Sequence, residues 1–348
     1  MTEARMAELL ERFASVRVAV VGDFFLDKYL EIEGALTEVS LETGLDAYQV
    51  VGKRLSPGAA GTVTNNLTAL GAGTVYAVGF IGDDGEGYEL RQGLAQTGVD
   101  MTHLISREDL FTPTYTKPML RDAQGVEREL NRIDIKNRRA TPTEVESAVL
   151  AQLWALLPQV QAVIIADQIA ERDLGVVTDR VREEIAALAR ANPEVVFLAD
   201  SRASIGLFRD VIVKPNRLEA ANACGYGGTE DGVTPEMAER FGAELVARNH
   251  RPVFVTVGAE GIIVFDGEGS THVPGIPVPE TVDIVGAGDS TTAGIVMALC
   301  AGASPQEAAV MGNCVASLTV QQIGTTGTAS RNEVAARFTE ARERFAAV

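Results

Sequence analysis

The stretch TVDIVGAGDSTTAGIVMALCAG, residues 281–302, places two glycines and an aspartate directly before an apolar run of helical length. Gly286 and Gly288 can adopt backbone angles that are closed to other residues, and they let a ligand approach the main chain closely. Asp289 then falls at the start of a helix, where free N–H groups and the helix dipole stabilise negative charge. The stretch favours a loop that holds both a carboxylate base and an anion site, although an aspartate that merely caps a helix would give the same pattern.

The composition is that of a globular protein with one large domain or two. The 348 residues are 46% hydrophobic and 22% charged, which is enough apolar material for a sizeable core. The formal net charge of -18 argues against a nucleic-acid or anionic-membrane partner, because either would require a basic face. A phosphorylated ligand stays compatible if helix ends, a few Lys or Arg side chains and a divalent cation meet its charge locally.

Cysteine and histidine are scarce, and neither shows a metal-binding spacing. We expect the three cysteines, Cys224, Cys300 and Cys314, to be buried thiols in a reducing compartment. The first 22 residues read as a polar, amphipathic helix leading into a strand, with no long apolar run for export or membrane spanning. The sequence therefore predicts a cytoplasmic protein.

Short β-branched runs alternate with longer helical patterns along most of the chain. Near-continuous apolar runs, such as RVAVVGD (17–23) and QAVIIAD (161–167), suit parallel strands that are covered on both faces. Amphipathic segments such as 143–157 and 174–191 are long enough for crossover helices. The pattern predicts an α/β fold, with a doubly wound, mostly parallel sheet and helices on both faces, in a single domain over residues 1–348.

Two segments, at about 28–55 and 112–133, break this alternation. Both alternate apolar and polar residues, as strands with one solvated face do. They are predicted to form a small β lid inserted beside the core. Strands so few and short need cover for their apolar face, so we expect a homodimer that pairs lids. The side chains expected on the two faces of the lid are Tyr48, Val50, Tyr115 and Met119.

Acidic residues follow several of the predicted core strands. Asp23 and Asp27 follow the first strand, while Asp167 and Asp200 each end a later one. Any one of them could be a helix cap or a turn residue. Because ligands of open α/β sheets bind at the carboxyl ends of the strands, several such residues at one edge predict a ligand site there.

The motifs at this edge carry a family resemblance. DIVGAGD (283–289) is similar to the D-T-x-G-A-G-D signature of the PfkB (ribokinase-like) sugar kinases, with Ile284 and Val285 in place of the usual threonines. Other segments resemble the family's marks in the same order: GDFFLD (22–27), PGAAGTVTNN (57–66), KPNRLEA (214–220), VTVGAEG (255–261) and GNCVAS (312–317). The resemblance covers residues 18–338 and lies nearest the heptose-phosphate kinase branch. It implies an ATP-dependent kinase that transfers the γ-phosphoryl group to a hydroxyl of a sugar or sugar phosphate.

The resemblance also implies the catalytic roles. Asp289 would be the general base, and the backbone N–H groups of Gly286, Ala287 and Gly288 would form the anion hole. Asp283 resembles the residue at which a monovalent-cation site, for K⁺, begins in many relatives.

The nucleotide side follows in the same way. Asn216 and Glu219, three residues apart, resemble the pair that positions Mg²⁺ and its waters beside the phosphates, although Asn216 could instead be a helix N-cap. The residues that would line the nucleotide are Thr256, Gly258, Gly261 and Asn313; the glycines could equally belong to a hairpin.

On the sugar side, Asp27 resembles the family's hydroxyl-binding aspartate, and Gly58 starts its glycine turn. Relatives usually read G-G-x-x-N there, whereas this chain has Ala59 at the second glycine and Thr62 at the asparagine, so that Asn65 or Asn66 would have to compensate. The branch's lysine after an aspartate-proline step is replaced by Arg202. Four cations of the lid are candidates to recognise a phosphate on the sugar, unless they are solvated surface charges: Lys117, Arg121, Arg128 and Arg132.

Other function classes fit the sequence less well. An oxidoreductase would need G-x-G-x-x-G after a strand, and a P-loop enzyme G-x-x-x-x-G-K-[ST]; neither motif occurs. A nucleoside kinase of the same fold and a catalytically silent sugar or nucleotide sensor stay open as alternatives.

Overall fold

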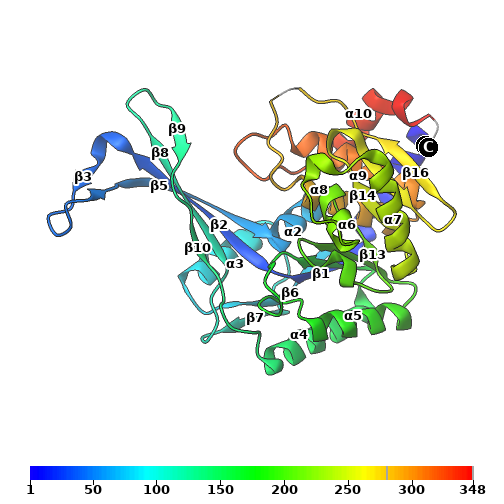
Figure 1. Cartoon of the computed structure of the whole chain (residues 1–348), viewed down its shortest axis with the longest axis horizontal. Coiled ribbons are helices and arrows are strands. Elements are labelled where there is room, and N and C mark those ends of the chain that lie inside the picture. The colour runs from blue at the N-terminus through cyan, green and yellow to red at the C-terminus, as the bar shows by residue number, and fades with distance from the viewer. Residues whose placement is uncertain (280, 347–348) are drawn as a thin grey trace.

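The computed structural model describes residues 1–279 and 281–346 and contains the predicted α/β core (Figure 1). Within these residues, nine strands form one sheet in the order β16-β15-β14-β13-β12-β11-β1-β6-β7. Neighbours are parallel from β7 to β14, and the edge strands β15 and β16 add antiparallel pairs. The strands are β1 (Arg17–Gly22), β6 (Thr74–Gly82), β7 (Leu104–Arg107), β11 (Ala162–Asp167), β12 (Val196–Ser201), β13 (Ile212–Val213), β14 (Val253–Thr256), β15 (Gly261–Phe265) and β16 (Ser270–Pro274). The prediction of a doubly wound, mostly parallel sheet is confirmed.

Helices cover both faces of this sheet, because its strands are apolar on both sides. One face packs against α1 (Glu3–Arg12), α2 (Ala60–Ala69), α3 (Gly85–Gln96), α8 (Ala287–Cys300), α9 (Pro305–Thr319) and α10 (Arg331–Ala341). The other packs against α4 (Thr143–Leu156), α5 (Asp179–Ala191), α6 (Arg217–Ala223) and α7 (Pro235–Asn249). Helix α8 lies inside its layer and is buried from Ser290 to Ala298, which explains why its sequence is apolar all round. No helix in these residues is both long and apolar enough to cross a membrane.

Two local predictions need correction. Helix α5 begins at Asp179, five residues later than its amphipathic pattern suggests, because the hydroxyl of Thr178 accepts a hydrogen bond from the Val181 N–H and so caps the helix there. The three cysteines are free thiols, but only Cys314 is fully buried.

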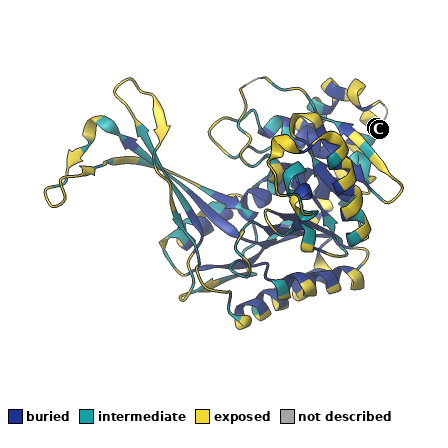
Figure 2. Cartoon of the chain, in the orientation of Figure 1, coloured by how far each residue is buried: buried dark blue, intermediate teal, exposed yellow. Residues whose placement is uncertain are grey.

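The predicted lid is present as a separate sheet that projects from the core (Figure 1). Its order is β10-β8-β2-β5, with β9 paired to β8, and it consists of β2 (Phe24–Glu33), β5 (Val50–Ala59), β8 (Thr114–Arg121), β9 (Glu127–Glu129) and β10 (Ile133–Ile135). The lid begins at Phe24 rather than near residue 28, because β2 continues the chain directly from β1. A hairpin of β3 (Glu38–Val39) and β4 (Asp46–Ala47) forms its exposed tip (Figure 2).

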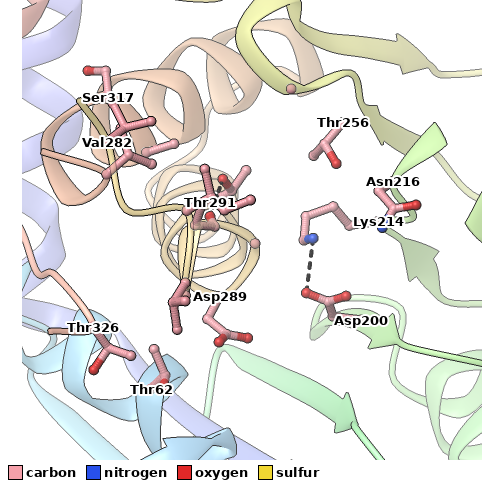
Figure 3. A pocket seen from close by; sticks show the side chains of 18 of the residues that line it. Thr62, Asp200, Lys214, Asn216, Thr256, Val282, Asp289, Thr291, Ser317 and Thr326 are labelled. Atoms are coloured by element: carbon pink, nitrogen blue, oxygen red, sulfur yellow. Dashed lines mark hydrogen bonds and ion pairs between the residues drawn. The ribbon is translucent and has the colours of Figure 1, made fainter. Parts of the chain in front are cut away.

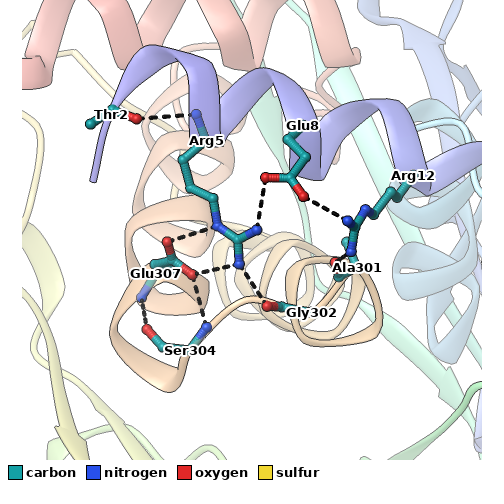
Figure 4. A network of polar contacts seen from close by, with 8 residues as sticks. All are labelled: Thr2, Arg5, Glu8, Arg12, Ala301, Gly302, Ser304 and Glu307. Carbon is teal, nitrogen blue, oxygen red and sulfur yellow. Dashed lines mark hydrogen bonds and ion pairs between the residues drawn. The ribbon is translucent and has the colours of Figure 1, made fainter.

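Helix α1 is fastened to the far end of α8. The guanidinium of Arg5 donates to the carboxylate of Glu307 at 3.0 and 3.2 Å and to the Gly302 carbonyl at 2.7 Å (Figure 4). Arg12 donates to the Ala301 carbonyl at 3.0 Å. These bonds cap the carboxyl end of α8 with positive charge, which complements its dipole, and so help to hold the helix whose other end carries Asp289.

Candidate active site

A cavity of about 1110 Å³ lies between the carboxyl ends of the core strands, the start of α8 and the lid. It brings together most of the residues singled out in the sequence. Those that line it are Asp27, Lys117, Arg132, Asn216, Glu219, Thr256, Gly258, Gly261, Gly286, Ala287, Gly288, Asp289 and Asn313. Gly58, Asn65, Asn66 and Asp283 are not among the lining residues.

The glycine loop leads directly into α8. Gly286 is the N-cap, with a left-handed φ of 80°, and no side chain caps the helix. The Ala287 N–H donates to the Ile284 carbonyl at 3.1 Å, so the first-turn N–H groups available to a ligand are those of Gly288 and Asp289, which no side chain caps. Space is tight beside Gly286, where a Cβ would lie 3.2 Å from Cγ2 of Thr62, whereas a Cβ on Gly288 would make an ordinary contact with Nζ of Lys214 at 3.6 Å.

Asp289 is an unusual carboxylic acid. Desolvation, and after it the negative charge of Asp200, raises the pKa of Asp289 to about 8, although Lys214 opposes the shift. An ordinary aspartate is too weak a base to take a proton from an alcohol, and the raised pKa brings Asp289 closer to that task.

A buried ion pair lies beside Asp289, and its lysine has no separate role in the predictions made from the sequence. Nζ of Lys214, only 3% exposed, lies 2.9 Å from Oδ2 of Asp200, which also accepts a 2.9 Å bond from the Thr292 hydroxyl (Figure 3). The two partners leave the ends of the paired strands β12 and β13. Burial works to lower the pKa of Lys214, but Asp200 and Glu219 outweigh it and raise that pKa, so the ammonium stays charged. A lysine directly after the apolar run VIV was the available signal.

Asn216 and Glu219 form a capping box at the start of α6. The Asn216 amide oxygen accepts from the Glu219 N–H, and the Glu219 carboxylate accepts from the Asn216 N–H, each at 2.8 Å. The N-cap interpretation of Asn216 is therefore correct, and both residues also line the cavity. Desolvation, followed by repulsion from Asp200, raises the pKa of Glu219 to about 7.

These carboxylates fit a divalent cation that is bound through water. The negative charge of Asp200 raises the pKa of both Glu219 and Asp289, and a cation in the cavity would offset this repulsion. Across residues 1–279 and 281–346, no cluster of three or more acidic, histidine or cysteine side chains is arranged to ligate a metal directly. Mg²⁺ commonly keeps several waters and binds substrate phosphates, so it does not require three protein ligands.

Two of the residues predicted to line the nucleotide, Gly261 and Asn313, also stabilise the local structure. Gly261, with φ 107°, ends the turn between β14 and β15, and a Cβ there would overlap the backbone of β16, so the hairpin interpretation holds for it. The amide nitrogen of Asn313 donates to the carbonyls of Val273 and Pro274, both at 3.1 Å. Its amide group is thereby oriented by β16.

The lid contributes a charged sugar-side wall. Lys117 lies 3.0 Å from Oδ1 of Asp27 and donates to the Tyr29 hydroxyl at 3.0 Å. Arg132 makes two bonds to Asp134, at 2.7 and 2.9 Å, and stacks 4.2 Å above the ring of Tyr115. Arg121 and Arg128, the other two lid candidates, do not line the cavity.

The glycine turn before α2 departs from expectation. Asn65 and Asn66, predicted to compensate for the missing asparagine, are not among the residues that line the cavity; Asn66 is fully buried and donates to the Thr62 carbonyl at 3.0 Å. Ala59 and Thr62 line the cavity themselves. Gly58 makes room for the side chain of Asp27, since a Cβ there would overlap its carboxylate.

Asp283 fastens the loop from outside the cavity. Its carboxylate accepts from the N–H groups of Val285 (3.1 Å) and Gly324 (3.0 Å). These bonds tie the segment before α8 to the 320–324 turn.

Comparison with known proteins identifies the family that this chain resembles. Residues 37–332 match the model of the pfkB family of carbohydrate kinases. The bifunctional protein HldE of Caulobacter sp. (strain K31) is 32% identical over 329 residues, which cover 92% of this chain and 62% of that protein. HldE of Geotalea uraniireducens (strain Rf4) is 31% identical, over 97% of this chain and 66% of that protein. The chain thus spans less than two thirds of the length of these relatives.

Solved structures share the fold. Arabidopsis thaliana ribokinase, complexed with ribose and ATP, has a TM-score of 0.68 at 20% identity, covering 93% of this chain and 98% of that one. Escherichia coli phosphofructokinase-2, in complex with potassium, has a TM-score of 0.70 at 16% identity, covering 94% and 99%. With the family match over most of its length, the chain belongs to the pfkB family of carbohydrate kinases.

Proposed function

We propose that this chain is an ATP-dependent kinase, acting as a single domain, that phosphorylates a hydroxyl of a sugar carrying a negatively charged group. The observation that carries the proposal is the cavity itself. It joins a base and an anion loop at the start of α8 to a charged acceptor wall on the lid. Phosphoryl transfer needs those elements aligned within one water-excluding site.

Each residue has a defined part in the proposed reaction. The acceptor hydroxyl donates its proton to Asp289 as its oxygen attacks the γ-phosphorus, and the ADP oxygen leaves with the electrons of the broken P–O bond. The N–H groups of Gly286 and Gly288, joined by that of Ala287 once it leaves the Ile284 carbonyl, stabilise the charge on the transferred oxygens. Lys214, already charged and beside Gly288, adds positive potential on the other side.

Mg²⁺ would neutralise the phosphates and orient them for attack. Asn216 and Glu219 would hold its waters, and the ATP would extend along Thr256 and Gly258 toward Asn313.

K⁺ at Asp283 is a further proposal, supported by that residue's place in the family motif. Higher turnover in K⁺ than in Na⁺ is expected, and equal rates in both would contradict it.

The acceptor is proposed to be a sugar phosphate or sugar acid. Lys117 and Arg132 reach the cavity from the lid, and Arg202 from the end of β12, where its charge opposes the rise in the pKa of Asp289 and of Glu219. Three cations would be poorly matched to an uncharged nucleoside. A silent sensor would not need the base and the anion loop, both of which the chain retains.

The homodimer through the lids also stays a proposal. Tyr115 contacts Phe25 at a ring distance of 5.0 Å and faces the cavity, whereas Tyr48 and Val50 are exposed on the outer part of the lid. Exposed apolar residues are frequent there: Leu36, Val39, Leu41, Leu45 and Val51. Light scattering at micromolar concentration should show a dimer, and a strict monomer with ligands present would contradict it. The cytoplasmic location remains a prediction.

A screen of ATP consumption tests the function. Sugars, sugar phosphates, sugar acids and nucleosides would be offered with Mg²⁺, and product formation measured for each. We expect turnover with an anionic sugar to exceed turnover with its neutral counterpart. Nucleosides as the best acceptors, or no turnover with any class, would overturn the proposal.

A further inference from the structure

Ala59 occupies a strained backbone conformation at the edge of the cavity. It ends β5 and precedes α2, with φ 53° and ψ -117°. Glycine accepts these angles without cost, while a Cβ crowds the backbone. Among residues 1–279 and 281–346, the other non-glycine residues with positive φ are Asp173, Asp210 and His250. Those are residue types that tolerate the left-handed region better than alanine does.

Neighbouring structure imposes this conformation. Ala59 is the last residue of the β2–β5 ladder, where it pairs with Phe24. The N–H of the next residue, Ala60, donates to the Asp23 carbonyl at 3.1 Å. With the chain fixed on both sides, a glycine would be the less costly residue. Strain that persists beside a ligand cavity indicates a function for the side chain that causes it.

The side chains around Ala59 form an apolar wall. Ala59 and Thr62 line the cavity together with the rings of Phe25 and Tyr115. The Thr62 hydroxyl lies 3.4 Å from the Pro57 carbonyl, and its methyl group points toward Gly286, below Asp289 in Figure 3. The start of α2 therefore presents methyl groups to the acceptor, while the cations Lys117 and Arg132 stand on the lid.

We propose that Ala59 is a specificity-determining residue of the acceptor site, an inference that rests on the proposed sugar-kinase function. Its methyl group fills the space through which a hydroxylated carbon would reach the backbone if the residue were glycine. The acceptor that fits carries hydrogen, rather than hydroxyl, at the carbon facing α2. Its anionic group faces Lys117 and Arg132.

The test uses Ala59→Gly with matched pairs of acceptors, each a sugar phosphate and its deoxy counterpart. We expect the wild-type chain to prefer the deoxy member of at least one pair. In A59G that preference, as a ratio of kcat/KM values, should fall about 10-fold through better use of the hydroxylated member, since one methyl group discriminates on that scale. The KM for ATP should not change, and Tm should rise because strain is removed.

His250→Gly is the control. His250 has φ 58° at the end of α7, so its replacement by glycine also relieves a positive φ. Because His250 is exposed and does not line the cavity, this replacement should leave the acceptor preference unchanged. An unchanged preference in A59G, or a lower Tm, would overturn the inference. So would a wild-type preference for the hydroxylated member of every pair. A wild-type chain that phosphorylates no acceptor would overturn the proposed function together with it, whereas turnover without an effect of A59G would leave the function standing.

Discussion

The two ends of the cavity are built differently. At the core end, Asp200, Lys214 and Asp289 come from paired central strands and a buried helix. Desolvation raises the pKa of Asp289, and neighbouring carboxylates raise the pKa of Lys214 against the effect of burial. At the lid end, the ion pairs are more exposed than the Lys214–Asp200 pair: the side chains of Lys117 and Asp27 are 14% and 12% exposed, and those of Arg132 and Asp134 are 44% and 26% exposed. Exposed ion pairs contribute little to the free energy of folding, and their side chains can change position easily. Buried charges are held firmly, because separating them from their partners leaves an unpaired charge in a desolvated site. The core end is therefore suited to catalysis, and the lid end to acceptor recognition. Changes at the core end should act on kcat, and changes at the lid end on KM.

Asp289→Asn should have the largest effect. Removing the base should lower kcat by about 10²-fold or more, with the KM values for both substrates nearly unchanged. Steady-state kinetics measure it, with Glu268→Gln, an exposed change on the β15–β16 hairpin, as the control. Turnover within a few-fold of wild type would remove Asp289 from the role of base.

Lys214→Met is expected to come next. It removes the cation beside the anion loop and leaves Asp200 without its partner, so kcat should fall by roughly 10- to 100-fold. Because Lys214 lowers the pKa of Asp289, its loss should also move the rise of kcat/KM to higher pH. Lys214→Arg should restore part of the rate. A change confined to Tm, with normal kcat in the folded fraction, would show that the lysine is only structural.

The pH dependence gives a third test. Below its pKa of about 8, Asp289 is neutral in the free protein, so kcat/KM should rise about 10-fold per unit up to that pH. Folding raises this pKa, so the protonated form stabilises the folded chain, and that contribution is lost as pH increases from about 4 through about 8. Asp289→Asn should therefore gain Tm over wild type as pH rises. A flat Tm difference would contradict the raised pKa.

Glu219→Gln should raise the Mg²⁺ concentration needed for half-maximal rate by roughly 5-fold, because one charge that attracts the hydrated cation is lost. The amide can still accept the Asn216 N–H bond, so α6 should keep its cap. Titration of activity with Mg²⁺ measures the effect. Full activity in excess EDTA, in wild type or variant, would show that no divalent cation is needed.

Lys117→Gln should have the smallest effect on turnover and the clearest effect at the lid end. The KM for the anionic acceptor should rise about 3- to 10-fold, with kcat and the KM for ATP little changed. Arg121→Gln, a lid cation outside the cavity, is the matched control and should change neither. A fall in kcat as large as that of Lys214→Met would break the division between the two ends.

The sequence predicted the core sheet well because strand periodicity and apolar runs are local signals. It placed the lid segments correctly, but not their ends, since Phe24–Glu33 is defined by pairing with both β5 and β8. It also could not exclude Asn65 and Asn66 from the sugar site. Their distance from the cavity depends on where α2 begins and which of its turns is covered by α8.

The sequence by itself determined the features that fit within a few consecutive residues. The loop at 286–289 and the reciprocal bonds of Asn216 and Glu219 are of this kind, because the atoms involved are joined by short stretches of backbone. Only the tertiary structure decided the pairing of Asp200 with Lys214, the raised pKa of Asp289 and the strain at Ala59. Coulomb energy and desolvation depend on distances through space, and the angles at Ala59 are imposed by β2 and α2 together. Such quantities exist only once separate elements have packed against one another.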